Sequence, residues 1–131
     1  MRTLIAHRQP GARSALRLFL EQEPGVSVVA EVDRPGEIVA KACSSRVDLV
    51  LLDYDLVATR IKELIVALHE TRGLCVMVLC DHIESRGGVL HAGADYYVDK
   101  GESPDQLISA LRKCLNKSNQ EAQRMGEPEA G

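Results

Sequence analysis

The amino-acid sequence predicts an α/β domain built on a doubly wound, five-stranded parallel sheet. Short apolar runs alternate with amphipathic stretches five times along the chain. Such alternation is typical of βαβ units, whose right-handed crossovers place helices on both faces of a sheet. The length of 131 residues suits one domain around one core. We predict that this domain occupies residues 1–117.

The first half of the chain contains three of the predicted strands. Residues 4–6 form the first apolar run, and a helix is expected after Pro10-Gly11 because apolar side chains recur at helical spacing. These side chains are Ala12, Ala15, Leu16 and Phe19. Residues 26–32 are predicted as the second strand and residues 37–44 as a short helix. Residues 47–52 are nearly all apolar, which is expected of a parallel strand buried on both faces.

The second half continues the alternation. A helix is predicted from apolar residues at i, i+3, i+4 and i+7, namely Ile61, Leu64, Ile65 and Leu68. Residues 75–79 and 96–98 are predicted as the fourth and fifth strands. Between them, residues 83–91 are predicted as a weaker helix, because Gly87-Gly88 costs backbone entropy.

The last helix has a recognisable start and a buried stripe. Ser103 can cap it, Pro104 suits its first position and Gln106 can complete a capping box. The stripe consists of Leu107, Leu111, Cys114 and Leu115. Residues 118–131 are polar and lack an apolar face, so we expect a disordered tail or linker there.

Composition excludes several classes of function. The net charge of −3 gives no electrostatic reason to bind nucleic acid or an anionic membrane. No apolar run approaches the length of a transmembrane helix, and the chain turns polar at residues 7–9, so we expect no signal peptide. We therefore expect a cytoplasmic protein. Its four cysteines, Cys43, Cys75, Cys80 and Cys114, are then expected as free thiols.

Polar residues follow the predicted strands. In open parallel sheets, sites lie beyond the carboxyl ends of the strands, where the strand order reverses. The residues expected there are His7, Arg8, Asp53, Asp55, Cys80, Asp81, Asp99 and Lys100. Asp53 follows four buried apolar residues, a costly place for an acid without a function. Motifs of metalloproteases, P-loops and nucleophile elbows are absent from the sequence, and we expect a protein that is not an enzyme.

The order of these residues resembles the receiver domain of bacterial response regulators, most closely the receivers that precede a helix-turn-helix output domain. The resemblance covers residues 2–117. It rests on residues 4–6 with Pro10, on the strand ending in Asp53, on residues 91–100 and on Ser103-Pro104. It implies a flavodoxin-like (βα)5 fold with strand order 2-1-3-4-5.

The resemblance also implies roles for single residues. Asp53 matches the phosphoacceptor position, Lys100 the lysine that contacts the phosphoryl group, and Tyr97 the switch aromatic. The implied function is to receive a phosphoryl group from a histidine kinase and to transmit a conformational signal. A homodimer through the fourth helix, fifth strand and fifth helix would fit this role.

Three positions depart from the receiver pattern. Receivers place an acidic pair after the first strand, where this chain has His7-Arg8. They place Ser or Thr after the fourth strand, where this chain has Cys80. The loop after Asp53 also lacks the usual Pro and Gly.

These departures weaken the expected phosphorylation chemistry. Mg²⁺ requires hard oxygen ligands, and only the Asp53 carboxylate and a carbonyl of Asp55 would remain. We expect Arg8 to pair with Asp53 and occupy the place of the metal, while a thiol at Cys80 is a weak hydrogen-bond donor. We therefore predict a signalling module that binds a histidine kinase or another signalling protein, without metal, cofactor or ordinary Mg²⁺-dependent phosphorylation.

Two alternatives remain open. Arg8 and Lys100 could neutralise a phosphoryl group on a working Asp53, with Mg²⁺ bound if the altered site tolerates it. The domain could instead be a sensor. It would respond either to oxidation of Cys80 or to a small ligand that binds in the Arg8–Asp53 pocket.

Overall fold

The computed structural model describes residues 1–71, 73–81, 83–101 and 104–126. In this part of the chain all five predicted strands form: β1 (Arg2–Ala6), β2 (Ser27–Val32), β3 (Leu49–Asp53), β4 (Cys75–Cys80) and β5 (Tyr96–Asp99). They build one sheet in the order β2-β1-β3-β4-β5, with every pair parallel. This confirms the predicted doubly wound, flavodoxin-like fold with strand order 2-1-3-4-5.

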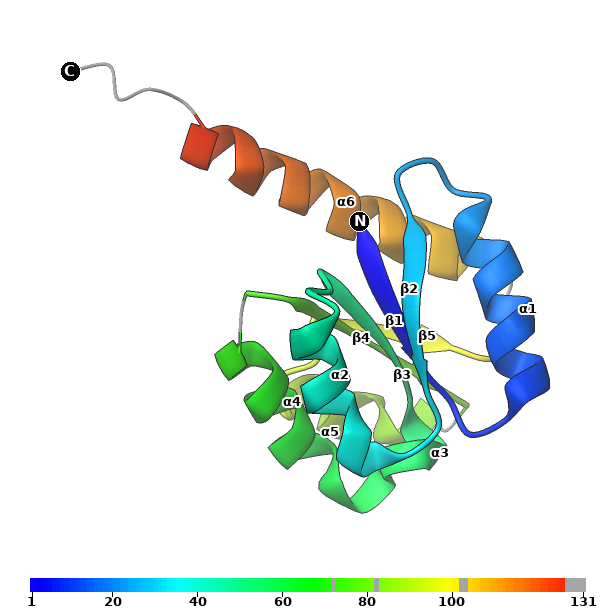
Figure 1. Ribbon diagram of the computed structural model, residues 1–131. Coiled ribbons are helices and arrows are strands. Elements are labelled where there is room, and N and C mark those ends of the chain that lie inside the picture. The colour runs from blue at the N-terminus through cyan, green and yellow to red at the C-terminus, as the bar shows by residue number, and fades with distance from the viewer. Residues whose placement is uncertain (72, 82, 102–103, 127–131) are drawn as a thin grey trace.

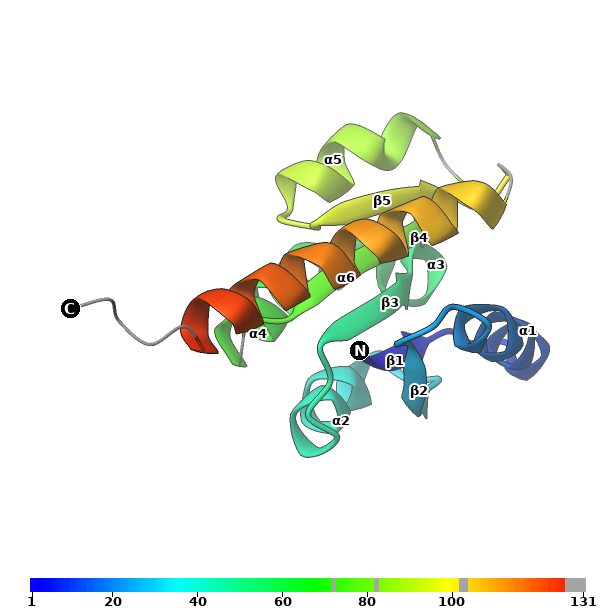
Figure 2. The same ribbon diagram turned by 90° about the horizontal axis from the view of Figure 1, so that it is seen from above.

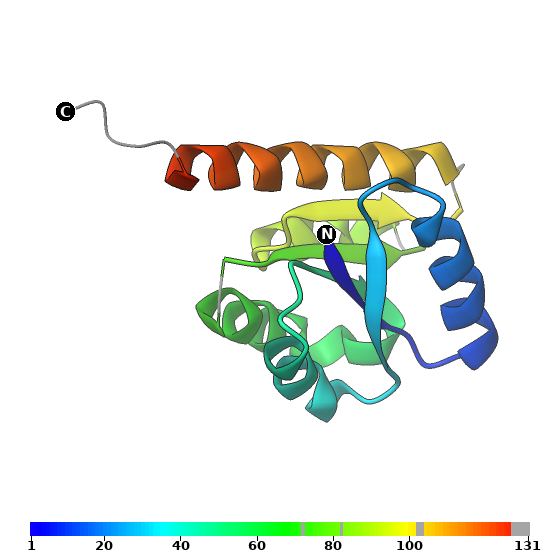
Figure 3. The ribbon, with the colours of Figure 1, turned by 45° about the horizontal axis from the view of Figure 1, so that its top comes forward.

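Helices cover both faces of the sheet (Figure 1). They are α1 (Pro10–Glu21), α2 (Ile38–Ser44), α3 (Tyr54–Val57), α4 (Ile61–Thr71), α5 (Arg86–His91) and α6 (Pro104–Gly126). α1 and α6 pack on one face, and α2, α4 and α5 on the other (Figure 3). α5 and α6 correspond to the fourth and fifth helices of the prediction. The short α3 was not expected, because its four residues are too few to show a period.

The strand β3 holds the two faces of the core together. Val50 and Leu52 face the cluster shared with α2, α4 and α5. Leu49 and Leu51 face the cluster shared with α1 and α6. All residues of β3 are buried, which explains why its sequence is a continuous apolar run rather than an alternating one. The one charged side chain of the strand, Asp53, stands at its carboxyl end.

The register of the sheet gathers the polar strand ends at one edge. Ala6 pairs with Leu52 across β1 and β3, so His7, the first residue after β1, lies beside Asp53. Cys80 pairs with Asp99 across β4 and β5, which brings Lys100 to the same edge.

The last helix is longer than predicted. α6 continues to Gly126, past the expected boundary at residue 117, and its C-terminal part extends beyond the sheet (Figure 3). Residues 120–125 are Gln, Glu, Ala, Gln, Arg and Met, and a helix that is already anchored extends through such good helix formers at little cost. Among the described residues, no helix is both long and apolar enough to cross a bilayer. Ser103, the predicted cap of α6, lies outside the described residues, as do residues 127–131.

Two glycines near α5 should respond in opposite ways to alanine. Gly93 follows α5 with φ of +107°, and an added Cβ would lie 3.3 Å from Ile65 Cγ2. Gly88 lies inside α5 with nothing within 4 Å of an added Cβ. We expect Gly93→Ala to lower the free energy of unfolding by about 1–3 kcal/mol and Gly88→Ala to raise it by about 0.5–1 kcal/mol. Urea unfolding followed by circular dichroism measures both, and equal effects would contradict this account of the α5 terminus.

Candidate functional site

Asp53 forms the centre of the site. It ends β3 and its side chain is only 3% exposed. The ammonium of Lys100 makes an ion pair with Asp53 Oδ1. On the other side, His7 Nε2 lies 3.7 Å from Asp53 Oδ2. The carboxylate is therefore enclosed between a cation and an imidazole.

Lys100 connects two acidic residues. It follows β5, where its backbone N–H donates to the carbonyl of Cys80 at 3.0 Å. Its Nζ also donates to Asp55 Oδ2 at 3.3 Å, so the ammonium bridges Asp53 and Asp55. Burial alone would lower the pKa of Lys100, but hydrogen bonds and attraction from these two carboxylates outweigh it and raise the pKa. Lys100 is thus a fixed positive charge at neutral pH.

His7 presents a neutral imidazole to Asp53. The backbone N–H of Gln9 donates to His7 Nδ1 at 3.1 Å, which leaves the ring proton on Nε2, the nitrogen nearest Asp53. Burial lowers the pKa of His7. Asp53 acts in the opposite direction, while Lys100 and Arg13 add to the lowering. His7 therefore places a neutral polar ring, and not a second cation, beside the Asp53 carboxylate.

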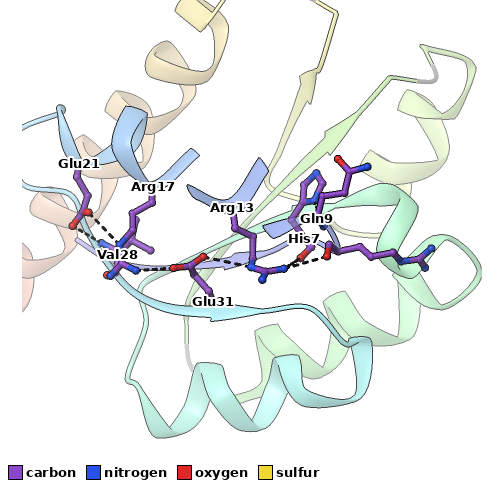
Figure 4. A network of polar contacts seen from close by, with 8 residues as sticks. His7, Gln9, Arg13, Arg17, Glu21, Val28 and Glu31 are labelled. Atoms are coloured by element: carbon purple, nitrogen blue, oxygen red, sulfur yellow. Dashed lines mark hydrogen bonds and ion pairs between the residues drawn. The ribbon is translucent and has the colours of Figure 1, made fainter. Parts of the chain in front are cut away.

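A chain of ion pairs fixes the loop that carries His7 (Figure 4). Arg13, in the first turn of α1, donates from Nη1 to the carbonyl of His7 at 2.8 Å and to that of Arg8 at 3.2 Å. Its Nε lies 3.4 Å from Glu31 Oε1 on the edge strand β2. Arg17 binds the same carboxylate at 2.6 Å and also donates to the carbonyl of Val28 at 3.0 Å. α1, β2 and the β1–α1 loop are thereby held together beside the site.

The predicted pair between Arg8 and Asp53 is wrong. Arg8 is exposed, and the partners of Asp53 are Lys100 and His7. Arg8 lies one residue further from the strand than His7. Because Lys100 already balances Asp53, burying a guanidinium there as well would add repulsion and a desolvation cost. The positioning role of Arg13 was also missed, since a single arginine on a helix gives no periodic signal.

The remaining predicted residues lie close by with different surroundings. Cys80 is fully buried and its sulfur is hydrogen-bonded to the hydroxyl of Tyr97. Burial and this bond raise the pKa of Tyr97 to about 12. Asp99 Oδ1 accepts the backbone N–H of Gly101 at 2.7 Å, and Asp81 is exposed. Within the described residues, no three His, Cys, Asp or Glu side chains are grouped so as to hold a metal ion.

Comparison with known proteins decides the family. The sequence model of the protein family described as the response regulator receiver domain matches residues 3–112 of this chain. This chain belongs to the response regulator receiver family. Receiver domains are signalling domains that interact with histidine kinases and output domains, so the resemblance noted from the strand ends is confirmed at the level of the family.

Its similarity to individual receivers is moderate. UvrY of Escherichia coli K12 is 32% identical over 113 residues, covering 79% of this chain and 49% of UvrY. The nitrate/nitrite response regulator NarP of the same strain is 26% identical over 127 residues, covering 95% of this chain and 59% of NarP. The receiver therefore spans about half the length of these relatives.

Solved structures show the same fold. A LuxR-family response regulator from Aurantimonas sp. SI85-9A1 superposes with a TM-score of 0.79 at 26% identity, covering 88% of this chain and 85% of that one. A CheY-like receiver from Methanospirillum hungatei JF-1 gives 0.77 at 27% identity, covering 92% and 97%.

The environment of His7 should make the stability of this receiver depend on pH. Because the pKa of His7 is lowered in the folded state, the unfolded chain binds more protons as the pH falls below about 6.5, the ordinary histidine value. The contribution of His7 is complete above that pH and is lost below it. We expect the free energy of unfolding to fall between pH 7.5 and 5.5, and His7→Gln to remove about 0.5–1 kcal/mol of that fall.

His91→Gln provides the control, because His91 is exposed on α5. Urea unfolding at the two pH values should give this variant the pH dependence of the wild type. The explanation fails if His7→Gln leaves the pH dependence unchanged.

Proposed function

We propose that this receiver signals through protein contacts from a pocket whose charge is balanced internally, without ordinary Mg²⁺-dependent phosphorylation of Asp53. The observation that carries the proposal is the position of Lys100, whose ammonium bridges Asp53 and Asp55. In this proposal the charge balance that receivers obtain from a divalent ion comes from the chain itself. A cytoplasmic histidine kinase or another signalling protein remains the proposed partner.

The donor set around Asp53 does not fit Mg²⁺. The ion takes oxygen ligands in near-octahedral geometry, but the position after β1 that receivers fill with acids holds the imidazole of His7, and Arg8 is exposed. Both nearby carboxylates, Asp53 and Asp55, are paired with Lys100. A metal would have to displace this ammonium while finding fewer oxygens than usual.

Output through Tyr97 would also differ from that of an ordinary receiver. The partner of its hydroxyl is the sulfur of Cys80, a weak hydrogen-bonding atom. Over the face of the ring, the guanidinium of Arg86 lies 5.9 Å from the ring centroid, within range of a cation–π contact. Packing rather than a phosphoryl group would then set the position of Tyr97.

The surface of α5, β5 and α6 is the proposed contact surface, and a second copy of this chain is its proposed occupant. The three elements lie side by side (Figure 2) and line an open pocket of about 410 Å³. Its lining carries both signs of charge: Arg86 and Lys113 with Asp95 and Asp99. Two copies related by a two-fold axis could place these opposite charges against one another.

The phosphoryl mimic beryllofluoride tests the pocket directly. We expect beryllofluoride with Mg²⁺ to leave the backbone NMR signals of Asp53, Cys80 and Lys100 of the wild type unchanged. In the double variant His7→Asp, Arg8→Asp, which restores the acidic pair, we expect these signals to shift, because the new carboxylates supply oxygen ligands.

Each outcome of this titration is informative. Shifts in the wild type would refute the proposal and support the alternative of a working phosphoacceptor at Asp53. The same titration of Asp53→Asn in the double-variant background should give no shifts, which identifies Asp53 as the site of binding. Folding of every variant is read from the same spectra.

Sedimentation velocity over a concentration series tests the contact surface. We expect the wild type to dimerise and Lys113→Glu to weaken the dimer at least about tenfold, because the reversed charge would face Asp95 or Asp99 of the second copy. Lys41→Glu makes the same change on α2, which packs against the edge strand β2 rather than against β5, and should dimerise like the wild type. A wild type that stays monomeric, or equal loss in both variants, would exclude this surface as a dimer contact.

A further inference from the structure

A pair of thiols lies at the edge of the sheet opposite the Asp53 pocket. Cys75 is the first residue of β4, and Cys114 lies on the buried stripe of α6. Both are free cysteines, and the function proposed above uses neither. They belong to elements that are far apart in sequence but packed in the same core cluster.

The two sulfur atoms are direct neighbours. A hydrogen bond joins the thiols of Cys75 and Cys114, and the hydroxyl of Tyr96 also bonds to Cys114. Cys114 is 4% exposed, whereas Cys75 is only partly buried. Cys75 is therefore the more exposed residue of the pair and Cys114 the more buried one.

From this arrangement we propose that Cys75 and Cys114 form a reversible disulfide that ties α6 to β4 under oxidising conditions. The proposal concerns a modification site that is separate from the Asp53 pocket and independent of its chemistry. The remaining cysteines offer no comparable partner: Cys43 is exposed on α2, and Cys80 is buried at the other end of β4.

Hydrogen peroxide is the proposed oxidant, because it is small enough for a partly buried site. The Cys75 sulfur attacks the peroxide, the O–O bond breaks, and a sulfenic acid and one water form. The Cys114 thiolate then attacks the sulfenic sulfur, so that the S–S bond forms and the S–O bond breaks. The departing hydroxide takes up the proton that the Cys114 thiol had released, which gives a second water. Two thiols are oxidised and one peroxide is reduced. A small thiol reverses the reaction by exchange.

The surroundings set the speeds of these two steps. The hydrogen bond with Cys114 and burial raise the pKa of Cys75, which makes the first step slow. The same hydrogen bond lowers the pKa of Cys114, although burial opposes it, which favours the thiolate needed in the second step. Asp95 and Lys117 are the charged groups that face the pair, with opposite effects on both thiols.

The consequence would be a more rigid attachment of the last helix. α6 supplies one side of the proposed contact surface and continues to Gly126. A disulfide between residues 75 and 114 closes a long loop, and closing a long loop reduces the entropy of the unfolded chain. Oxidation should therefore raise Tm by about 5–15 °C if the bridge forms without strain.

Mass spectrometry of the peroxide-treated protein tests the proposal. The variant Cys43→Ser serves as the background, because the exposed thiol of Cys43 would otherwise link two molecules. After treatment, alkylation in denaturant and proteolysis, we expect one peptide pair joined through Cys75 and Cys114, a higher Tm, and loss of both effects with dithiothreitol. Cys75→Ala and Cys114→Ala in the same background should show neither effect.

A second measurement tests whether the native fold, and not a random encounter of the two thiols, causes the disulfide to form. The same peroxide treatment in urea should give the Cys75–Cys114 bridge at a rate at least about tenfold lower, because the unfolded chain no longer holds the sulfurs together. The proposal is overturned if the folded protein forms no internal disulfide, if Cys80 is bridged as often as Cys75, or if the urea-treated chain reacts as fast.

Discussion

A carboxylate that is almost completely buried governs the organisation of this receiver. Removing a carboxylate from water costs several kcal/mol unless a cation compensates it, and Asp53 is only 3% exposed. Lys100 is that cation, so β5 has to end beside the pocket. Since the same ammonium also binds Asp55, the start of α3 is held by the one interaction that makes Asp53 tolerable. The positions of β5 and α3 beside the pocket therefore depend on the same ammonium, that of Lys100.

The strands and their common edge could be predicted from the sequence because both follow from local patterns. A continuous apolar run such as residues 49–52 is typical of a buried parallel strand, and a polar residue at its end marks the edge where sites form. The sequence therefore predicts that Asp53, Cys80 and Lys100 lie at the same edge of the sheet. The sequence pattern does not predict α3 or the last turns of α6, because neither segment has apolar residues at a regular spacing.

The partner of Asp53 could not be obtained by ranking charges. Arg8 carries the stronger charge, but the register that pairs Ala6 with Leu52 brings its neighbour His7 to the carboxylate. The choice depends on a balance that involves Lys100, from the far end of the sequence, and Arg13, which holds the loop by its carbonyls. Such long-range contacts cannot be recognised from periodicity or spacing in the sequence. Only the pairing of Ala6 with Leu52 shows that His7 is the neighbour of Asp53.

β4 joins the two proposed regulatory features through sulfur atoms at its opposite ends. At its carboxyl end, Cys80 contacts Tyr97, so that the ring is held by packing and by Arg86 rather than by a strong hydroxyl donor. At its amino end, Cys75 contacts Cys114 of α6. Both contacts reach the surface formed by α5, β5 and α6. If the pocket does not respond to a phosphoryl group, the shape of this surface depends on how firmly β4 holds Tyr97 and α6, and the thiol pair is the contact of the two that ordinary redox chemistry can make covalent.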